Sequence, residues 1–365
     1  MNLANKKDIV YQQIKKNIMS GKYSPGMRLP KEVEFAKHFG VSRITLRPAL
    51  DRLLDDGMVK RLRGKGTFVA TANEIKARRY LAIMPPDDES FESPMTHIMP
   101  GIEANAAEVS AHIQKYSINL FKSLEIAEGV PRIQEGRYNG VFYMGNGVNG
   151  DEQDIKIFKA SGLPVIIPHA SINDHSITGF ATMRPNDEKA FSAVLELLAS
   201  KGHKRIGSIF LGKKDTAKCR SFQLSDYTRF LKKVGIDNSP EFIHYYTEYH
   251  YDSIAEKVKK LMQLPKRPTA ILCSSDFVAL YVYQVLRKME IKIPEQVAVM
   301  GYCNSPEGEL LSPPLSTVDL FFEKTGRDAF ELMLRSDEWW KPGLEAPQIT
   351  TPFKIIERGS TNIQL

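Results

Sequence analysis

Two arginines at the start of one predicted helix are the residues of this sequence best suited to chemistry. Arg43 and Arg47 follow Ser42, a residue type that caps a helix by accepting a hydrogen bond from a backbone N–H. The residues that recur at helical spacing and predict a buried face are Leu46, Leu50 and Leu53. Both arginines fall off that face, so one side of the helix is expected to pack and the other to be basic. Taken alone, this pattern favours a solvated surface helix, and the surrounding sequence decides whether the basic side binds a partner.

A basic hairpin follows this helix. Gly57 ends the predicted helix, and two β-prone runs, 58–62 and 67–69, flank the sequence Arg63-Gly64-Lys65-Gly66. Such a turn needs glycine because its backbone φ becomes positive. A helix beside a two-stranded wing with a cationic tip fits a major groove, with the wing on the flanking phosphates.

Two further helical patterns precede the basic helix. A first helix is predicted before residue 20, and a second short helix opens at residues 29–32. The apolar residues expected to face inward are Tyr11, Ile14 and Ile18 in the first helix and Val33, Ala36 and Phe39 in the second. Three helices and a wing within about 70 residues are enough for one small domain.

Residues 7–70 resemble the winged helix-turn-helix of the GntR family of bacterial repressors. The shared patterns are G-x-Y-x-P-G-x-x-L-P-x-E, V-S-R-x-T-x-R-x-A-L and G-x-G-T-F-V. The resemblance implies base readout by Arg43 and Arg47. The remaining residues of the implied DNA interface are Arg28, Lys31, Ser42, Thr45, Lys65 and Gly66. Lys31 replaces a commoner serine and should add a phosphate contact, and Pro48 is expected to kink the recognition helix.

The net charge of +7 is unevenly distributed along the chain. Residues 1–79 contain 18 Lys and Arg against 7 Asp and Glu, whereas the remaining residues contain 32 against 36. The cationic surface of a nucleic-acid binder is therefore expected only in the first part. The three cysteines are far apart, so neither a disulfide framework nor a metal site is expected. No signal peptide or membrane span is recognisable, which favours a cytoplasmic protein without a membrane partner.

Residues 71–79 form a short polar and basic segment, which predicts a linker between a DNA-binding domain at 1–70 and a larger α/β domain at 80–365. Strands are predicted at 80–84, 113–121, 140–144, 164–168, 206–211, 270–273 and 297–302. Helices are predicted near 94–110, 151–161, 187–201, 222–235, 252–263 and 276–290. This alternation predicts parallel sheets covered by helices on both faces, with ligands at the carboxyl ends of the strands.

The same alternation would suit a dinucleotide-binding enzyme, but the sequence lacks the motifs that such chemistry needs. It contains no phosphate-cradling glycine motif after the first strand, no nucleophile elbow and no H-E-x-x-H pair. The titratable residues near the predicted strand ends, Asp87, Asp88, His169 and Asp276, form no recognised catalytic set. We therefore expect neither an enzyme nor a cofactor.

Residues 79–358 resemble the effector domain of the LacI family, which has the two-lobed periplasmic-binding-protein fold. The resemblance rests on ASKGHKRIGSIFLG, PTAILCSSDFVALYVYQVLRKMEIKIPEQVAVMGYCN and LSPPLSTVDLFFEKTGRDAFELML. A GntR-type head on a LacI-type body is the arrangement of arabinose-repressor-like regulators. It implies a homodimer that binds near-palindromic operator DNA and closes its lobes around a small-molecule effector, such as a sugar or sugar derivative.

The resemblance also implies effector-binding positions, and several of them depart from the family pattern. Phe322 stands where the family has an aromatic ring facing the ligand. The altered positions are Cys303 for an aspartate, followed by Asn304; Gln223 for an arginine, with Arg220 as a substitute; and Asn186-Asp187 for an Asp-Asn pair. Asp276, after Ser275, is retained, and capping of the next helix is an equally weighted role for it.

Phe91 and His169 are further effector candidates, because each lies in a loop that follows a predicted strand. A lid over the core and a structural hydrogen bond are the alternatives for these two residues. Loss of charged clamps predicts an effector other than a simple neutral monosaccharide bound in the usual way, or weak binding. An effector-blind DNA binder, whose second domain only dimerises, is the alternative function.

Overall fold

The computed structural model describes residues 3–62, 64–70, 78–85, 94–212, 224–247 and 250–363. They form two compact units, one of Met1–Arg78 with Glu108–His112 and one of Arg79–Ala107 with Ile113–Leu365. The first unit is called the head and the second the body. Most of the predicted linker, residues 71–77, lies outside the described residues, and the first strand of the body begins at Arg79.

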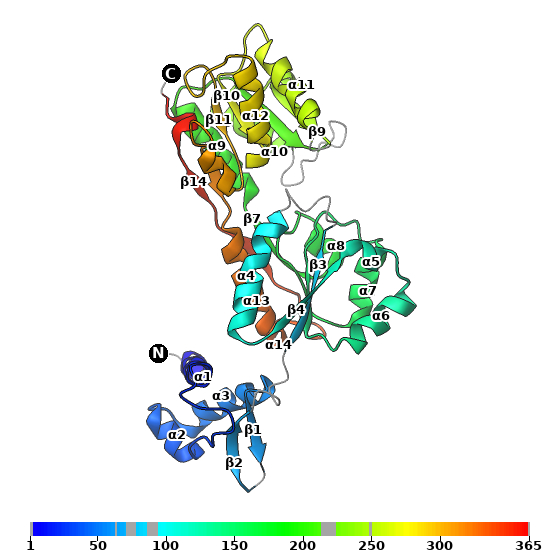
Figure 1. Ribbon diagram of the computed structural model, residues 1–365, viewed down its shortest axis with the longest axis vertical. Helices are drawn as coiled ribbons and strands as arrows, with labels where there is room; N and C mark the ends of the chain where they lie inside the picture. The colour runs from blue at the N-terminus through cyan, green and yellow to red at the C-terminus, as the bar shows by residue number, and fades with distance from the viewer. Residues whose placement is uncertain are drawn as a thin grey trace. The chain divides into compact units, whose positions relative to one another are not determined.

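The head consists of three helices and a hairpin (Figure 1). Its elements are α1 (Leu3–Met19), α2 (Glu32–His38), α3 (Arg43–Asp55), β1 (Val59–Leu62) and β2 (Gly66–Val69). The two strands are antiparallel, with Val59 opposite Val69. The helices pack around Phe35, whose side chain is fully buried with Ile14 and Leu53.

The prediction that Val33 faces inward is wrong, since its side chain is 61% exposed. Helix α2 has only seven residues, and Phe35 and Ala36 alone form its buried face. The other residues expected to face inward behave as predicted, with Phe39 only partly buried.

The first sheet of the body has the strand order β13-β7-β6-β5-β3-β4. Its strands are β3 (Arg79–Met84), β4 (His112–Ser117), β5 (Gly140–Tyr143), β6 (Val165–Ile167), β7 (Ala181–Pro185) and β13 (Gln348–Thr351). The pairings from β13 through β7, β6 and β5 to β3 are all parallel. Leu81 and Ile83 pack against one layer of helices, whereas Tyr80 contacts Phe330 of the other layer.

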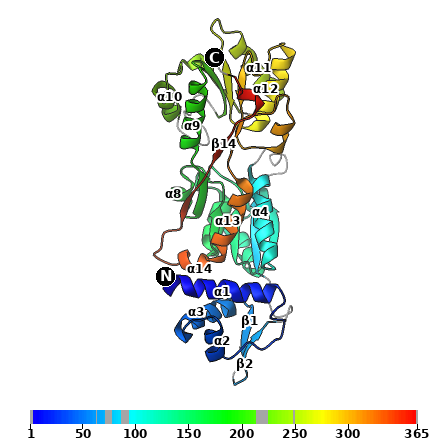
Figure 2. The same ribbon diagram turned by 90° about the vertical axis from the view of Figure 1, so that its left-hand side faces the viewer.

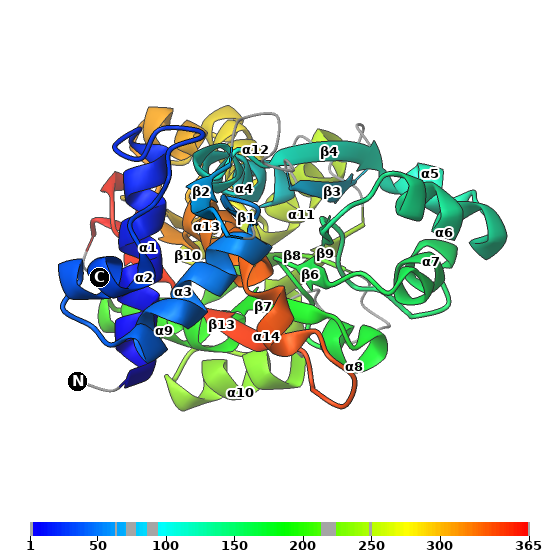
Figure 3. The same ribbon diagram turned by 90° about the horizontal axis from the view of Figure 1, so that it is seen from below.

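Helices cover both faces of this sheet. The layer of α5 (Ile118–Lys122), α6 (Ile126–Glu135) and α7 (Gln153–Ser161) lies to one side of the strands (Figure 3). Helices α4 (Pro94–Glu108) and α13 (Phe322–Leu334) run side by side in the other layer (Figure 2). The two helices approach so closely at Gly101 that a Cβ atom there would lie only 1.9 Å from the carbonyl oxygen of Glu323. A glycine at this position makes the approach possible.

The second sheet has the order β11-β10-β8-β9 and is parallel throughout. Its strands are β8 (Ile206–Leu211), β9 (Ile243–Tyr246), β10 (Ala270–Cys273) and β11 (Ala298–Met300). The helices that cover it are α9 (Asp187–Ser200), α10 (Leu224–Lys233), α11 (Tyr251–Met262) and α12 (Asp276–Lys288). Strand β12 (Thr317–Asp319) pairs antiparallel with β14 (Lys354–Ile356).

The chain passes between the two sheets three times, after β7, after β12 and after β13. The remaining elements are the short helices α8 (Asp174–Thr178) and α14 (Ser336–Trp339) and three 3₁₀ turns at Pro240–Phe242, Pro306–Leu310 and Gly359–Thr361. The predicted fold, a winged helix-turn-helix followed by a two-lobed α/β domain with parallel sheets, is confirmed.

One predicted strand is wrong in its second half. Residues 113–121 were expected to be extended, but α5 begins at Ile118. Ser117 caps this helix, because its Oγ accepts a hydrogen bond of 3.3 Å from the backbone N–H of Asn119. Among the described residues, none of the helices combines the length and the apolar composition needed to cross a bilayer.

Candidate nucleic-acid interface and effector region

Helix α3 buries one face and exposes the other. The Oγ of Ser42 caps the helix by accepting a hydrogen bond of 3.2 Å from the N–H of Thr45. The leucines that pack inward, Leu46, Leu50 and Leu53, are each at most 2% exposed. The side chains of Arg43 and Arg47 are 55% and 58% exposed. Both predicted base readers are therefore open to a partner.

Glu32 connects these arginines and was not recognised in the sequence as part of the interface. Its carboxylate lies 2.9 Å from Nε of Arg47 and 3.7 Å from an Nη of Arg43. It also lies 3.9 Å from an Nη of Arg61, which pairs more closely with Asp51, at 2.8 Å. The sequence feature that could have indicated this role is an acidic residue at the start of α2, within a strongly cationic segment.

The hairpin presents cationic and flexible residue types at its tip. Lys65 and Gly66 are exposed, and φ is positive at Gly64 (75°) and Gly66 (111°). A Cβ atom at Gly66 would lie 3.0 Å from Nε of Arg28, so Arg28 and the tip strand are adjacent. Arg28 and Lys31 are both exposed, and Arg63 lies outside the described residues.

Thr45 is more buried than its predicted role suggested, and Pro48 lies inside an unbroken helix. Thr45 is only 6% exposed, and its hydroxyl lies 3.0 Å from that of Ser42. Its predicted contact with the DNA backbone is therefore not supported, because the side chain is used in the helix cap. Helix α3 runs uninterrupted from Arg43 to Asp55, so Pro48 does not end it.

In the body, the structure brings two of the effector candidates, Phe322 and His169, into contact, and His97 joins them. The ring of His169 meets that of Phe322 edge-on, with centroids 5.5 Å apart. His97, on α4, stacks on the same ring at 6.2 Å and was not predicted. Burial lowers the pKa of His169 to about 4, so its imidazole is neutral at pH 7. Phe322 is itself 8% exposed.

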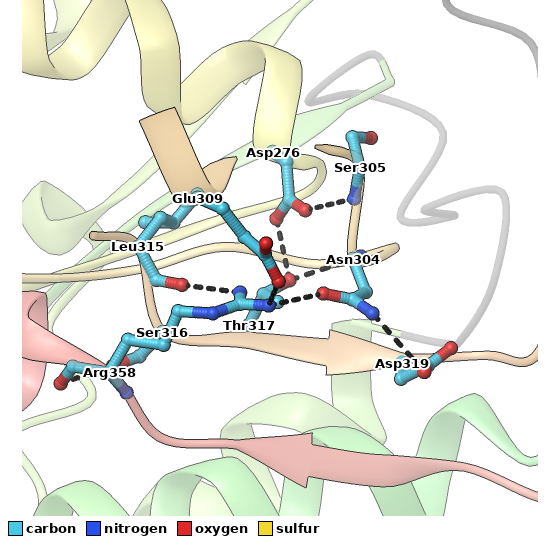
Figure 4. A network of polar contacts seen from close by, with 9 residues as sticks. All are labelled: Asp276, Asn304, Ser305, Glu309, Leu315, Ser316, Thr317, Asp319 and Arg358. Carbon is cyan, nitrogen blue, oxygen red and sulfur yellow. Dashed lines mark hydrogen bonds and ion pairs between the residues drawn. The ribbon is translucent and has the colours of Figure 1, made fainter. Parts of the chain in front are cut away.

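Asp276 lies at the centre of a polar network (Figure 4). Its carboxylate accepts hydrogen bonds of 2.6 Å from the N–H of Ser305 and from the hydroxyl of Thr317. Burial raises the pKa of Asp276 to about 7. The capping role considered for Asp276 is wrong, because Ser275 caps α12 by accepting a hydrogen bond from Val278.

The same network uses both ends of the Asn304 amide (Figure 4). Its Nδ2 donates to Asp319 at 3.2 Å, and its Oδ1 accepts from Arg358 at 3.0 Å. Arg358 also pairs with Glu309 at 2.7 Å. Cys303 precedes this residue with φ at 103°, and burial raises the pKa of its thiol far above the usual value. A neutral thiol replaces the carboxylate that the family resemblance implies.

The Asn186-Asp187 pair is also engaged internally. Asn186 caps α9 by accepting a hydrogen bond of 3.1 Å from the N–H of Lys189. The buried carboxylate of Asp187 accepts a 2.6 Å hydrogen bond from Tyr302, whose ring stacks on Phe191 at 4.7 Å. Burial raises the pKa of Asp187 to about 7. The remaining predicted effector residues, Phe91, Arg220 and Gln223, lie outside the described residues.

Two family models match the chain. Residues 6–69 match the bacterial regulatory proteins of the gntR family, and residues 195–361 match a periplasmic binding protein-like domain. The first match covers the capped helix and wing, and the second covers the sheet that carries the Asp276 network.

Two curated relatives align with most of the chain, and a third aligns with about half of it. An arabinose metabolism transcriptional repressor from Halalkalibacterium halodurans is 26% identical over 98% of this chain and 97% of its own length. The protein of the same name from Geobacillus stearothermophilus is 24% identical over 90% of each chain. The transcriptional repressor CytR of Escherichia coli is 30% identical over 47% of this chain and 49% of its own length.

Solved structures share the fold. A LacI-family regulatory protein from Chloroflexus aggregans has a TM-score of 0.62 at 17% identity, covering 78% of this chain and 98% of that one. The regulator CelR in complex with cellobiose also has a TM-score of 0.62, at 18% identity, covering 91% of this chain and all of that one. The chain is thus a transcriptional regulator that combines a DNA-binding domain of the gntR family with a periplasmic-binding-protein-like domain.

Proposed function

We propose that this regulator represses genes of carbohydrate metabolism by binding a near-palindromic operator as a homodimer. The observation that carries the proposal is the exposure of Arg43 and Arg47 on a capped helix whose other face is buried. A dimer brings two such helices to successive major grooves, and its symmetry then sets the spacing of the half-sites. The two full-length relatives named as arabinose metabolism repressors support the choice of repression and of carbohydrate genes.

Base readout is assigned to Arg43 and Arg47, with phosphate contacts from the exposed residues around them. A good bidentate contact to guanine contributes roughly 1–3 kcal/mol of discrimination. The exposed residues proposed to contact the DNA backbone are Arg28, Lys31, Ser42, Lys65 and Gly66. A protein that binds operator DNA acts where the chromosome lies. We therefore place this regulator in the bacterial cytoplasm.

The test compares variants on a DNA site selected from random duplexes with the full-length protein. Arg43→Ala should lose sequence preference, whereas Lys65→Ala should weaken binding to all duplexes alike and flatten the salt dependence. Arg229→Ala is a matched control, because Arg229 is an exposed, ion-paired arginine of the body. An unchanged ratio of specific to non-specific affinity in Arg43→Ala would show that this orientation of α3 is wrong.

We further propose that a small-molecule effector, a sugar or a sugar derivative, binds the body and lowers operator affinity. The cluster of Phe322, His97 and His169 supports this proposal, because ligand sites are lined largely by aromatic side chains with a few polar groups. Binding can shift the equilibrium only by the difference in effector affinity between the two states of the protein. Isothermal titration with neutral sugars and sugar acids tests this step, with Phe322→Ala as the variant expected to lose heat of binding.

A second function is supported by a specific observation. The carboxylate of Asp276 and both ends of the Asn304 amide are engaged in internal hydrogen bonds, which leaves these two side chains little capacity for a ligand, and the Oδ1 of Asn186 is used to cap α9. This favours an effector-blind regulator whose body serves only for dimerisation. A thermal-shift screen of sugars and sugar acids that stabilises the body with none of them would favour this alternative.

A further inference from the structure

The recognition helix carries an apolar side chain that the fold does not use. Ile44, the second residue of α3, is 83% exposed, the highest value among the large hydrophobic side chains described in the head. The buried face of α3 is already complete with Leu46, Leu50 and Leu53. Single exposed apolar side chains are common on protein surfaces, so exposure alone assigns Ile44 no partner. What distinguishes Ile44 from the other exposed apolar residues of the head is its place on the recognition helix.

The position of Ile44 on the helix limits what it can contact. Residues three apart lie on one face of a helix, so Ile44 and Arg47 point outward together. Arg43 precedes Ile44 and is also exposed. The first turns of a recognition helix are the part that approaches base edges in the major groove. Ile44 therefore lies between the two proposed base readers, in the same approach to DNA.

The major groove offers one apolar feature, the 5-methyl group of thymine. A branched aliphatic side chain between two guanidinium groups matches a thymine that neighbours guanines. A protein partner is less well matched, because Ile44 has one cationic neighbour directly before it, Arg43, and another about one turn later, Arg47. We propose that Ile44 contacts the 5-methyl group of a thymine and so specifies a T·A pair beside the guanines read by Arg43 and Arg47. This inference rests on the proposed reading of DNA by α3.

The test removes the methyl group from the DNA. Each thymine of a selected duplex is replaced in turn by deoxyuridine, and the affinity of the full-length protein is measured by fluorescence anisotropy. Burial of one methyl group predicts about fourfold weaker binding at one position in each half-site. Ile44→Ala should bind the thymine and deoxyuridine duplexes alike, because the variant lacks the side chain that contacts the methyl group.

Ile9→Ala is the matched control, because Ile9 is a half-exposed isoleucine on α1. It should keep the preference for thymine over deoxyuridine. Uniform affinity for every deoxyuridine duplex, or a thymine preference that persists in Ile44→Ala, would overturn the inference while leaving DNA reading by the arginines intact. Failure to select any DNA sequence would instead overturn the proposed function and this inference together.

Discussion

The polar side chains at the candidate sites are mostly exposed in the head, whereas in the body the described ones are buried or half-buried. In the head, Arg43 and Arg47 share the carboxylate of Glu32, whose side chain is 25% exposed, and keep more than half of their own surface open to solvent. In the body, Asp276 is only 1% exposed and is held by neutral donors. A residue that matches a family position can bind a partner only if its hydrogen-bonding groups are not already engaged. Arg43 and Arg47 keep exposed surface beside their contacts with Glu32, whereas most described polar candidates of the body are engaged inside the protein.

Removing the carboxylate of Asp276 should give the largest effect on stability. Asp276→Ala leaves the N–H of Ser305 and the hydroxyl of Thr317 without their acceptor in a buried site. Loss of such partners should lower the free energy of unfolding of the body by about 3 kcal/mol. Both tryptophans of the chain, Trp339 and Trp340, lie in the body, so tryptophan fluorescence in urea reports its unfolding.

The control for this variant is Glu357→Ala, which removes a carboxylate with an exposed side chain that is paired with Lys201 in the same unit. Exposed ion pairs contribute up to about 1 kcal/mol, so this variant should unfold close to the wild type. Equal urea midpoints for Asp276→Ala and Glu357→Ala would show that the hydrogen bonds around Asp276 do not stabilise the body.

The carboxyl group of Asp187 should make the stability of the body depend on pH. Its pKa is raised to about 7 by burial, so the folded state holds a proton that the unfolded state has released. Its contribution is greatest below about pH 4 and is lost as pH rises to about 7, with about 2 kcal/mol lost between pH 5 and 7. Asp187→Asn still accepts the hydrogen bond from Tyr302 and has no such titration.

The measurement is the difference in unfolding midpoint between the wild type and Asp187→Asn at pH 5, 6, 7 and 8. Asp276 has a similarly raised pKa but is present in both proteins, so its titration cancels in the difference. We expect the advantage of the wild type to shrink as pH rises. A constant difference would mean that Asp187 is ionised throughout this range.

Pro48 tests whether the head can gain stability at its exposed surface. Proline removes one backbone N–H from the interior of α3, so Pro48→Ala should restore a hydrogen bond to the carbonyl of Ile44. The gain should be about 1 kcal/mol, because proline also restricts the unfolded chain. Hydrogen exchange of the α3 backbone amides measures this gain in stability. If the proline kinks the helix as the sequence suggests, the variant should also change its preference among operator sequences.

Periodicity and turn chemistry were enough to predict most of the fold. Leu46, Leu50 and Leu53 gave the orientation of α3, and apolar runs located most strands of both sheets. The errors came from short elements, where packing decides more than local pattern. Residues 118–122 are apolar enough for a strand, but the cap at Ser117 makes them helical. Val33 lies on a helix too short to have a clear apolar face.

The candidate sites were less predictable because hydrogen-bond partners distant in sequence determine which groups remain free. Nothing near Asn304 in the sequence indicates that Arg358 and Asp319 engage both ends of its amide. The burial of Thr45 likewise follows from the packing of α3 on its neighbours. The exposed arginines were predictable, since they lie opposite a regular apolar face.

Glu32 should show the smallest effect on folding, although it contacts both proposed base readers. Glu32→Gln removes ion pairs whose side chains are all at least a quarter exposed, so the free energy of unfolding of the head should fall by less than about 1 kcal/mol.

On DNA, the loss of one negative charge in Glu32→Gln should strengthen binding to every duplex and steepen the salt dependence. The preference for the selected site should fall, because a neutral glutamine amide orients the guanidinium group of Arg47 more weakly than the carboxylate that now accepts from its Nε at 2.9 Å. Anisotropy titrations on selected and scrambled duplexes at several salt concentrations separate the two effects. Tighter binding with an unchanged preference would show that Glu32 tunes charge alone, whereas a destabilised head would show that this exposed network resembles the buried one after all.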